Sequence, residues 1–158
     1  MLISWLHLTS LAVYLGSLVG LRVMVLPALS VVKNHAEQVK LLARSLRLYN
    51  PLQIGSLGLL VLSGAFQLTD LKDAYRELFL KELGVILGLK LVFSFVLIVV
   101  STFQSMGVAH RFVRRYEGGE PFSPQELQHV TQRLRTSTIV ILLLAIITLW
   151  LGVQLRGA

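Results

Sequence analysis

Long apolar runs, separated by shorter polar segments, dominate the pattern of this chain. The runs cover residues 3–26, 51–68, 83–106 and 138–153. Each is close to the roughly 17–25 residues that a helix needs to cross about 30 Å of hydrocarbon. Because open strands leave backbone groups unsatisfied in lipid, the runs predict four membrane-spanning helices.

The composition agrees with this pattern. Of the 158 residues, 54% are hydrophobic and 15% are charged, and the mean hydropathy is +0.72, which is too apolar for an ordinary soluble domain. No Lys or Arg precedes the first run, and it lacks a clear small-residue cleavage site, so we expect a retained span and not a signal peptide. The predicted fold is an all-α integral membrane protein, a single domain of residues 1–158 forming a bundle of four transmembrane helices.

Basic residues predict the orientation of the bundle. Two connections, 33–50 and 107–136, carry most of the chain's 15 lysines and arginines: Lys33, Lys40, Arg44, Arg47, Arg111, Arg114, Arg115, Arg133 and Arg135. The opposite side carries Lys72, Arg76, Lys81 and Arg156. The positive-inside rule therefore places the two basic connections in the cytoplasm and both termini outside, and we expect the bilayer to be a bacterial inner (plasma) membrane. Without a nucleic-acid-binding motif or an aromatic platform, the charge favours anionic lipid headgroups over nucleic acid.

Both basic connections are predicted to contain helical extensions. Ser123-Pro124-Gln125-Glu126 matches a capping box with proline at the first helical position, so the fourth helix should begin well below the membrane. The first connection has an apolar stripe at helical spacing after Pro27, which predicts an amphipathic helix: Val39, Leu42, Ala43, Leu46 and Tyr49.

Lys90 is the least expected residue of the apolar runs. A charge near the centre of a membrane helix costs roughly 2.5–3.5 kcal/mol on insertion scales. If the third helix enters near Leu83, Lys90 lies about 10 Å deep, in the outer half of the bilayer, and His7 has a similar depth on the first helix. The two residues are therefore candidates for a functional site at matching depth, although a snorkelling lysine and an interfacial histidine are the structural alternatives.

Polar residues recur at helical spacing on three of the predicted spans. The stripes are His7, Ser10, Tyr14 and Ser17; Gln53, Ser56, Ser63 and Gln67; and Lys90, Ser94 and Ser101. Lipid disfavours polar side chains, so the stripes should converge inside the bundle with His7 and Lys90 at its outer end. The fourth span offers little polarity beyond Thr138 and Thr148, which predicts a structural role. For the serines, bonding to their own helix backbone is the alternative, and Arg22 is expected to snorkel.

A resemblance covers most of the chain. Trp5-Leu-His7 opens the first run, Leu26-Pro27-Ala28-Leu29 closes it, Arg47-Leu-Tyr49 leads into the second, Leu62-Ser63-Gly64 lies near its end, and Leu89-Lys90-Leu91 lies in the third. In this order, the features resemble the copper-resistance D (CopD) domain and its HemJ-type relatives, four-helix membrane proteins that act as oxygen-independent protoporphyrinogen oxidases. The resemblance implies that His7 and Lys90 are the functional pair associated with haem. This chain differs from HemJ-type proteins after Pro27, where it has Ala-Leu-Ser-Val-Val in place of their aromatic-rich segment. The difference favours the broader CopD-like group.

Two classes of function remain open at this stage. In the first, the protein handles haem b or another tetrapyrrole: His7 ligates iron, Lys90 pairs with a propionate or an acidic substrate group, and Tyr14 lies nearby. In the second, it is a non-enzymatic bundle that moves copper or serves in a homo-oligomer or larger membrane complex, with Lys90 paired to Glu82, Tyr14 or a partner's carboxylate. The chain has no cysteine, which excludes thiolate metal sites and haem attachment through Cys-x-x-Cys-His. The three methionines do not cluster as a Cu(I) pathway would require.

Overall fold

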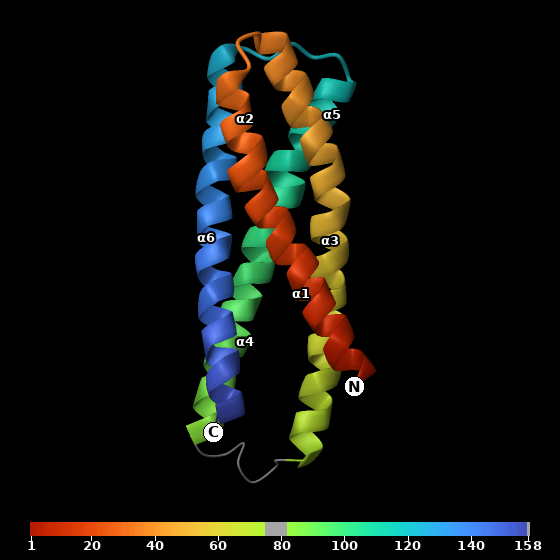
Figure 1. The fold of residues 1–158 in the computed structure, drawn as a ribbon, viewed down its shortest axis with the longest axis vertical. Coiled ribbons are helices and arrows are strands. Elements are labelled where there is room, and N and C mark those ends of the chain that lie inside the picture. Colours follow the sequence, from red (N-terminus) through yellow and green to blue (C-terminus); the bar gives the residue numbers. More distant parts are fainter. Residues whose placement is uncertain (75–81, 158) are drawn as a thin grey trace.

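The computed structural model describes residues 1–74 and 82–157, with side chains for residues 1–69 and 85–154. Every regular element in these parts is helical. In chain order they are α1 (Leu2–Gly20), the π-helical segment η1 (Leu21–Val25), α2 (Leu26–Val31), α3 (His35–Ala74), α4 (Glu82–Thr102), the π-helical segment η3 (Phe103–Ala109), α5 (His110–Glu117) and α6 (Pro124–Gly157). Figure 1 shows them as long rods running side by side, with both termini toward the same end.

Four of these helical stretches are long and apolar enough to cross a membrane. They cover Leu2–Val31, His35–Thr69, Val85–Glu117 and Pro124–Gln154, each 30 to 35 residues long. Large apolar side chains cover much of their outer surface, among them Phe66, Phe95, Ile146 and Trp150, each at least 60% exposed. Such a surface is unstable in water and suits a lipid environment. The described helices thus confirm an all-helical, membrane-compatible bundle.

The first helical stretch continues past Pro27, although the sequence predicts that it closes near Leu26. A proline inside a helix lacks an amide donor and clashes with the preceding turn. Here the wide π-helical turn η1 lies directly before it, and the Leu26 amide reaches back five residues to the Leu21 carbonyl. This wider turn accommodates the proline ring, and α2 then ends at Val31.

The amphipathic helix predicted for the first basic connection is present. It is continuous with the second span, because α3 begins at His35 and includes Pro51 in its interior. All five residues of the predicted apolar stripe, Val39 to Tyr49, are buried. The stripe packs against η3 and α5. The second span and its extension therefore form one helix of 40 residues.

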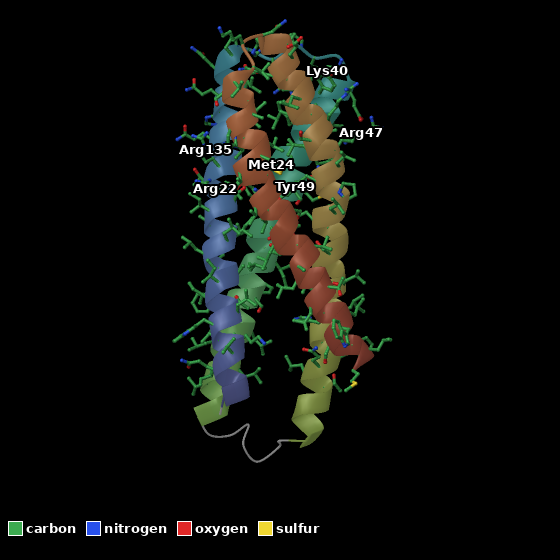
Figure 2. The ribbon with its side chains drawn as sticks, in the orientation of Figure 1. Arg22, Met24, Lys40, Arg47, Tyr49 and Arg135 are labelled. Carbon is green, nitrogen blue, oxygen red and sulfur yellow. The ribbon has the colours of Figure 1, made fainter. Side chains whose placement is uncertain are left out.

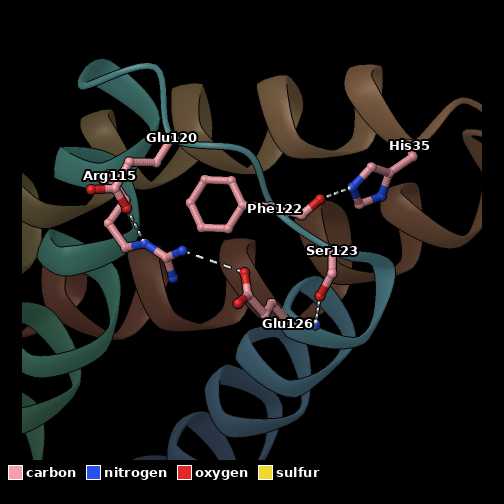
Figure 3. Close-up of polar contacts among 6 residues, drawn as sticks. All are labelled: His35, Arg115, Glu120, Phe122, Ser123 and Glu126. Carbon is pink, nitrogen blue, oxygen red and sulfur yellow. Dashed lines mark hydrogen bonds and ion pairs between the residues drawn. The ribbon is translucent and has the colours of Figure 1, made fainter.

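The fourth helix begins where the sequence predicts. Pro124 is its first residue, and Ser123 caps it: the Glu126 amide donates to Ser123 Oγ at 3.2 Å and the Leu127 amide to Ser123 O at 3.1 Å. The Glu126 carboxylate is turned toward Arg115, whose guanidinium also pairs with Glu120 (Figure 3). These contacts fix the turn between α5 and α6.

An aromatic contact reinforces the same turn. Phe122 stacks on Phe112 with ring centroids 4.6 Å apart, and the Arg115 guanidinium lies over the Phe122 ring. His35 Nε2 lies 2.6 Å from the Phe122 carbonyl oxygen, which ties the start of α3 to the turn (Figure 3). We call this end of the molecule, with residues 32–35 and 118–124, the basic end, and the opposite end, with residues 2 and 157, the termini end.

The bundle consists of two closely packed helix pairs. α1 packs along α3, and α4 packs along α6. Contacts between the pairs are made mainly by η3 and α5 against α3, and Figure 1 shows the pairs drawing apart toward the termini end. His7 belongs to the first pair and Lys90 to the second.

Candidate functional site

His7 is held by a hydrogen bond from α1 to α3. Its Nδ1 lies 2.8 Å from Ser63 Oγ, and Ser63 Oγ in turn donates to the Leu59 carbonyl at 2.6 Å. A serine hydroxyl has one proton, so with that proton on the Leu59 carbonyl, Ser63 accepts from Nδ1–H of the imidazole. The lone pair of a neutral His7 is then on Nε2. Metal-ligating histidines are commonly oriented in this way, by a hydrogen bond from the other ring nitrogen.

Gly64 provides the space for the His7 ring. A Cβ atom at this position would lie 3.5 Å from His7 Cε1 and 4.0 Å from Nδ1. These are ordinary van der Waals distances, so the imidazole lies directly beside Gly64. The adjacent residues Ser63 and Gly64 thus give His7 a hydrogen-bond acceptor and a flat surface on α3. Two residues of the Leu62-Ser63-Gly64 segment thus contact His7.

Lys90 has an equivalent arrangement on the other helix pair. It projects from α4 against α6, where a Cβ atom on Gly152 would lie 3.3 Å from Lys90 Nζ and 3.6 Å from Cε. The side chain is half-buried. A glycine on the neighbouring helix again makes room for the polar group. Glu82, one suggested partner of Lys90, has its side chain outside the described part of the structure.

Tyr14 does not share the surroundings of His7. Its side chain is 1% exposed and its hydroxyl is hydrogen-bonded to Ser101 Oγ of α4, which is 0% exposed. This contact joins the two helix pairs. One turn further along α1, Ser17 Oγ lies 2.7 Å from Gln53 Oε1 and 2.8 Å from the Tyr14 carbonyl oxygen. Tyr14 therefore belongs to a buried polar core nearer the middle of the helices.

The predicted convergence of the polar stripes is confirmed for their central members. Six residues of the three stripes are buried: Ser10, Tyr14, Gln53, Ser56, Ser63 and Ser101. His7, Ser17, Gln67, Lys90 and Ser94 are half-buried. Within the described part of the chain, Ser56 bonds only to carbonyl groups of its own helix, as expected for a packing serine.

Sequence reasoning missed Gln104, which is the centre of the polar core. Its amide oxygen accepts from Tyr49 Oη at 2.9 Å, and its amide nitrogen donates to Ser137 Oγ at 2.9 Å and Thr138 Oγ1 at 3.0 Å. These contacts connect η3 with α3 and α6. Gln104 follows Ser101 by three residues, so extending the Lys90–Ser94–Ser101 stripe would have found it. It also gives the fourth helix a polar role through Thr138, whereas its sequence indicated little polarity.

Arg22 makes a specific contact with α6. Its Nη1 donates to the Arg135 carbonyl oxygen at 2.9 Å, and Figure 2 shows the two residues at neighbouring heights of the bundle. The guanidinium is therefore held by a backbone group of another helix, where the sequence indicated a snorkelling side chain. His110 and His129 are exposed, and His35 contacts the Phe122 carbonyl.

The described His, Cys, Asp and Glu side chains form no clustered metal site. Within residues 1–69 and 85–154, no three or more His, Cys, Asp or Glu side chains form a group that could hold a metal ion. Met1, Met24 and Met106 are all more than half exposed: Met1 precedes α1, Met24 lies on η1 and Met106 lies on η3. A haem iron, by contrast, can be held by one axial imidazole, with further contacts at the porphyrin edge.

Comparisons with known proteins leave the resemblance as a prediction. No protein-family model matches the sequence, and no curated protein or solved structure gives a significant match. The residues themselves must therefore support any functional assignment.

Proposed function

We propose that this protein is a membrane protein that handles haem or another tetrapyrrole, with His7 as the iron ligand and Lys90 as the cation that pairs with a carboxylate of the ligand. The observation that carries this proposal is the contact of His7 Nδ1 with Ser63 Oγ, which also contacts the Leu59 carbonyl. With the serine proton on that carbonyl, the imidazole proton is on Nδ1 and the lone pair is on Nε2. A surface or packing histidine does not require such an oriented acceptor. Iron ligation by imidazole does benefit from one.

Lys90 complements His7 in charge. The two residues lie on different helix pairs, and each is accommodated by a glycine of the neighbouring helix. A large, flat, apolar ligand with carboxylate groups matches one neutral donor and one cation within apolar surroundings. When bound, haem would supply redox chemistry, while His7 orients the iron and Lys90 holds the acidic edge. A HemJ-like oxidoreductase activity is the corresponding reaction class.

The orientation and the membrane belong to the same proposal. We place the termini end, with His7 and Lys90, outside, and the basic end in the cytoplasm of a bacterial inner membrane. The alternatives are a non-enzymatic CopD-like copper transporter and a structural subunit of a homo-oligomer or larger complex. Copper has less support, because the three methionines do not cluster along the sequence and the described residues contain no group of three or more His, Cys, Asp or Glu that could hold a metal ion.

A visible absorption spectrum of the purified protein tests the proposal. With haem present during expression, the wild type should show a Soret band, and His7→Ala should lose or shift it. His129→Ala is the matched control, because His129 is exposed at the basic end. Equal effects of the two substitutions, or a wild type that takes up copper and no haem, would overturn the assignment.

A further inference from the structure

A second polar region, distinct from His7 and Lys90, lies where α3 meets η3. Three buried side-chain atoms there have no hydrogen-bond partner among the described residues: Asn50 Oδ1, Gln53 Nε2 and Ser105 Oγ. Gln53 is 0% exposed and Ser105 is 1% exposed. Buried polar atoms are nearly always hydrogen-bonded, so this concentration of unpaired atoms requires an explanation.

The three residues lie close to one another along α3 and η3. Asn50 and Gln53 are one helical turn apart on the same face of α3. Tyr49, which precedes Asn50, donates to Gln104, and Gln104 precedes Ser105. All three residues therefore lie within about one turn of the Tyr49–Gln104 hydrogen bond. Ser105 belongs to the π-helical segment η3, and wide turns of this kind are frequent at functional sites.

The chemistry of these atoms defines what would satisfy them. Asn50 Oδ1 requires a donor. Ser17 has one hydroxyl proton but two acceptors within 2.8 Å, the Tyr14 carbonyl and Gln53 Oε1. Ser17 can therefore contact either the oxygen or the nitrogen of the Gln53 amide. In both orientations of the amide, its other polar atom faces the region of the unpaired atoms. A simple anion cannot donate a hydrogen bond to Asn50 Oδ1. Water can donate to Asn50 Oδ1 and can either donate to or accept from the Gln53 amide, so it fits both orientations of the amide.

We propose that one or more internal water molecules bind between Asn50, Gln53 and Ser105, and that they complete the polar core that joins the two helix pairs. Such water supplies the missing partners for these groups, as buried water does in many proteins. It also extends the Tyr49–Gln104 contact into a hydrated region within an otherwise apolar bundle. This site stands on its own contacts and does not depend on haem binding by His7.

Hydroxyl-radical labelling tests the site, because radicals formed from a bound water oxidise the buried side chains beside it. The protein in phosphatidylcholine nanodiscs is irradiated briefly in ¹⁸O-labelled water and analysed by mass spectrometry. Tyr49 is 5% exposed, and Phe112, at 2%, is an aromatic control held in an aromatic stack. Tyr49 should be oxidised several-fold faster than Phe112. Labelling of Tyr49 at or below the level of Phe112 would overturn the proposal.

A variant separates bound water from other sources of labelling. Asn50→Leu combined with Gln53→Met removes two of the polar groups with little change in volume, and it should reduce Tyr49 oxidation to the level of Phe112. Ser56→Ala on the same helix is the control and should leave Tyr49 oxidation unchanged. Undiminished labelling of Tyr49 in a folded double variant would also overturn the proposal. If the double variant does not fold, the wild-type comparison still decides the question.

Discussion

The ammonium nitrogen of Lys90 lies 3.3 Å from the position that a Cβ atom on Gly152 would occupy, so the glycine of α6 leaves room for this charge beside the helix. Gly152→Leu should displace the ammonium group and weaken haem retention, while the Soret position set by His7 changes little. Thermal unfolding of the same variant should be near wild type, because leucine favours a helix by several tenths of a kcal/mol relative to glycine.

Gly88→Leu is the matched control for this substitution. Gly88 lies on α4 near Lys90, and a Cβ atom there would have no neighbour within 4 Å. Haem titration of both variants by absorbance compares them directly. If Gly88→Leu weakens haem retention as much as Gly152→Leu, the effect comes from helix packing in general and not from the position of Lys90.

Ser63 is expected to act as a positioning residue for His7. Ser63→Ala removes the acceptor at Nδ1, so the imidazole can adopt either tautomer and rotate. Loss of such an orienting contact commonly costs 10- to 100-fold in metal affinity. We expect a loss of this size in haem affinity, measured by titration, and recovery in Ser63→Thr, which restores the hydroxyl.

Ser56→Ala provides the comparison for Ser63. Both serines are buried on α3 and both donate to carbonyls of their own helix, but of the two only Ser63 contacts His7 among the described residues. Ser56→Ala should retain haem as the wild type does. Similar affinity losses in the two variants would show that the hydrogen bond to His7 carries no special weight.

Several features of the fold were predictable from local sequence patterns, and the structure contains them. The stripe from Val39 to Tyr49 is buried because its spacing matches one face of a helix, and Ser123 caps α6 because its side chain reaches the exposed amides of the first turn. The continuity of helices through Pro27 and Pro51 was not predictable in this way. Proline ends most helices, and only the neighbouring π-helical turn η1 shows how Pro27 is accommodated.

The sequence singles out His7 and Lys90 as candidate residues, but it does not predict their contacts. Lys90 stands out in the sequence because placing a charge inside an apolar membrane helix is unfavourable in free energy. This argument does not require knowing which residues contact it. That His7 contacts Ser63, and that Lys90 contacts Gly152, depends on which helices pair. Apolar faces of similar composition do not specify their partners, so the sequence grouped Tyr14 with His7 whereas the fold pairs it with Ser101.

Gln104 should contribute to the stability of the bundle through its three hydrogen bonds. Gln104→Leu leaves Tyr49 Oη without this acceptor, and an unsatisfied buried group costs about 1–3 kcal/mol in proteins generally. Individual side-chain hydrogen bonds in membrane proteins average about 0.6 kcal/mol, so we expect a loss of about 1–2 kcal/mol in the free energy of unfolding.

A double-mutant cycle isolates this contribution. Tyr49→Phe removes the other partner, and the double variant with Gln104→Leu should be little less stable than Gln104→Leu alone, because the shared hydrogen bond is lost only once. Reversible unfolding in detergent mixtures supplies the free energies. Strict additivity of the two substitutions would contradict a direct Tyr49–Gln104 interaction.

The proposed orientation leads to a separate prediction. A reporter fused after Ala158 should be active only when it requires an outside location, such as alkaline phosphatase, while a reporter inserted in the turn at Gly118–Gly119 should report the cytoplasm. Both positions are chain ends or turns, so the helices stay intact. A cytoplasmic signal from the fusion at Ala158 would contradict the proposed orientation and place His7 and Lys90 on the cytoplasmic side.

Lys90 itself gives the sharpest test of the proposed function. Lys90→Met keeps the stem volume and removes a charge that costs roughly 3 kcal/mol in a membrane helix, so insertion should be as good as in the wild type or better. Haem loading should nevertheless fall strongly, because the carboxylate of the ligand loses its cation. Lys90→Arg should recover loading only in part, since a planar guanidinium is bulkier than an ammonium group beside Gly152.

A purely structural role for Lys90 predicts a different result. In that case Lys90→Met would either load haem normally or unfold the bundle, because a buried partner of the lysine would be left uncompensated. Insertion, thermal stability and haem content measured on this variant separate the two accounts, and a stable Lys90→Met protein with full haem content would refute the role proposed for the lysine.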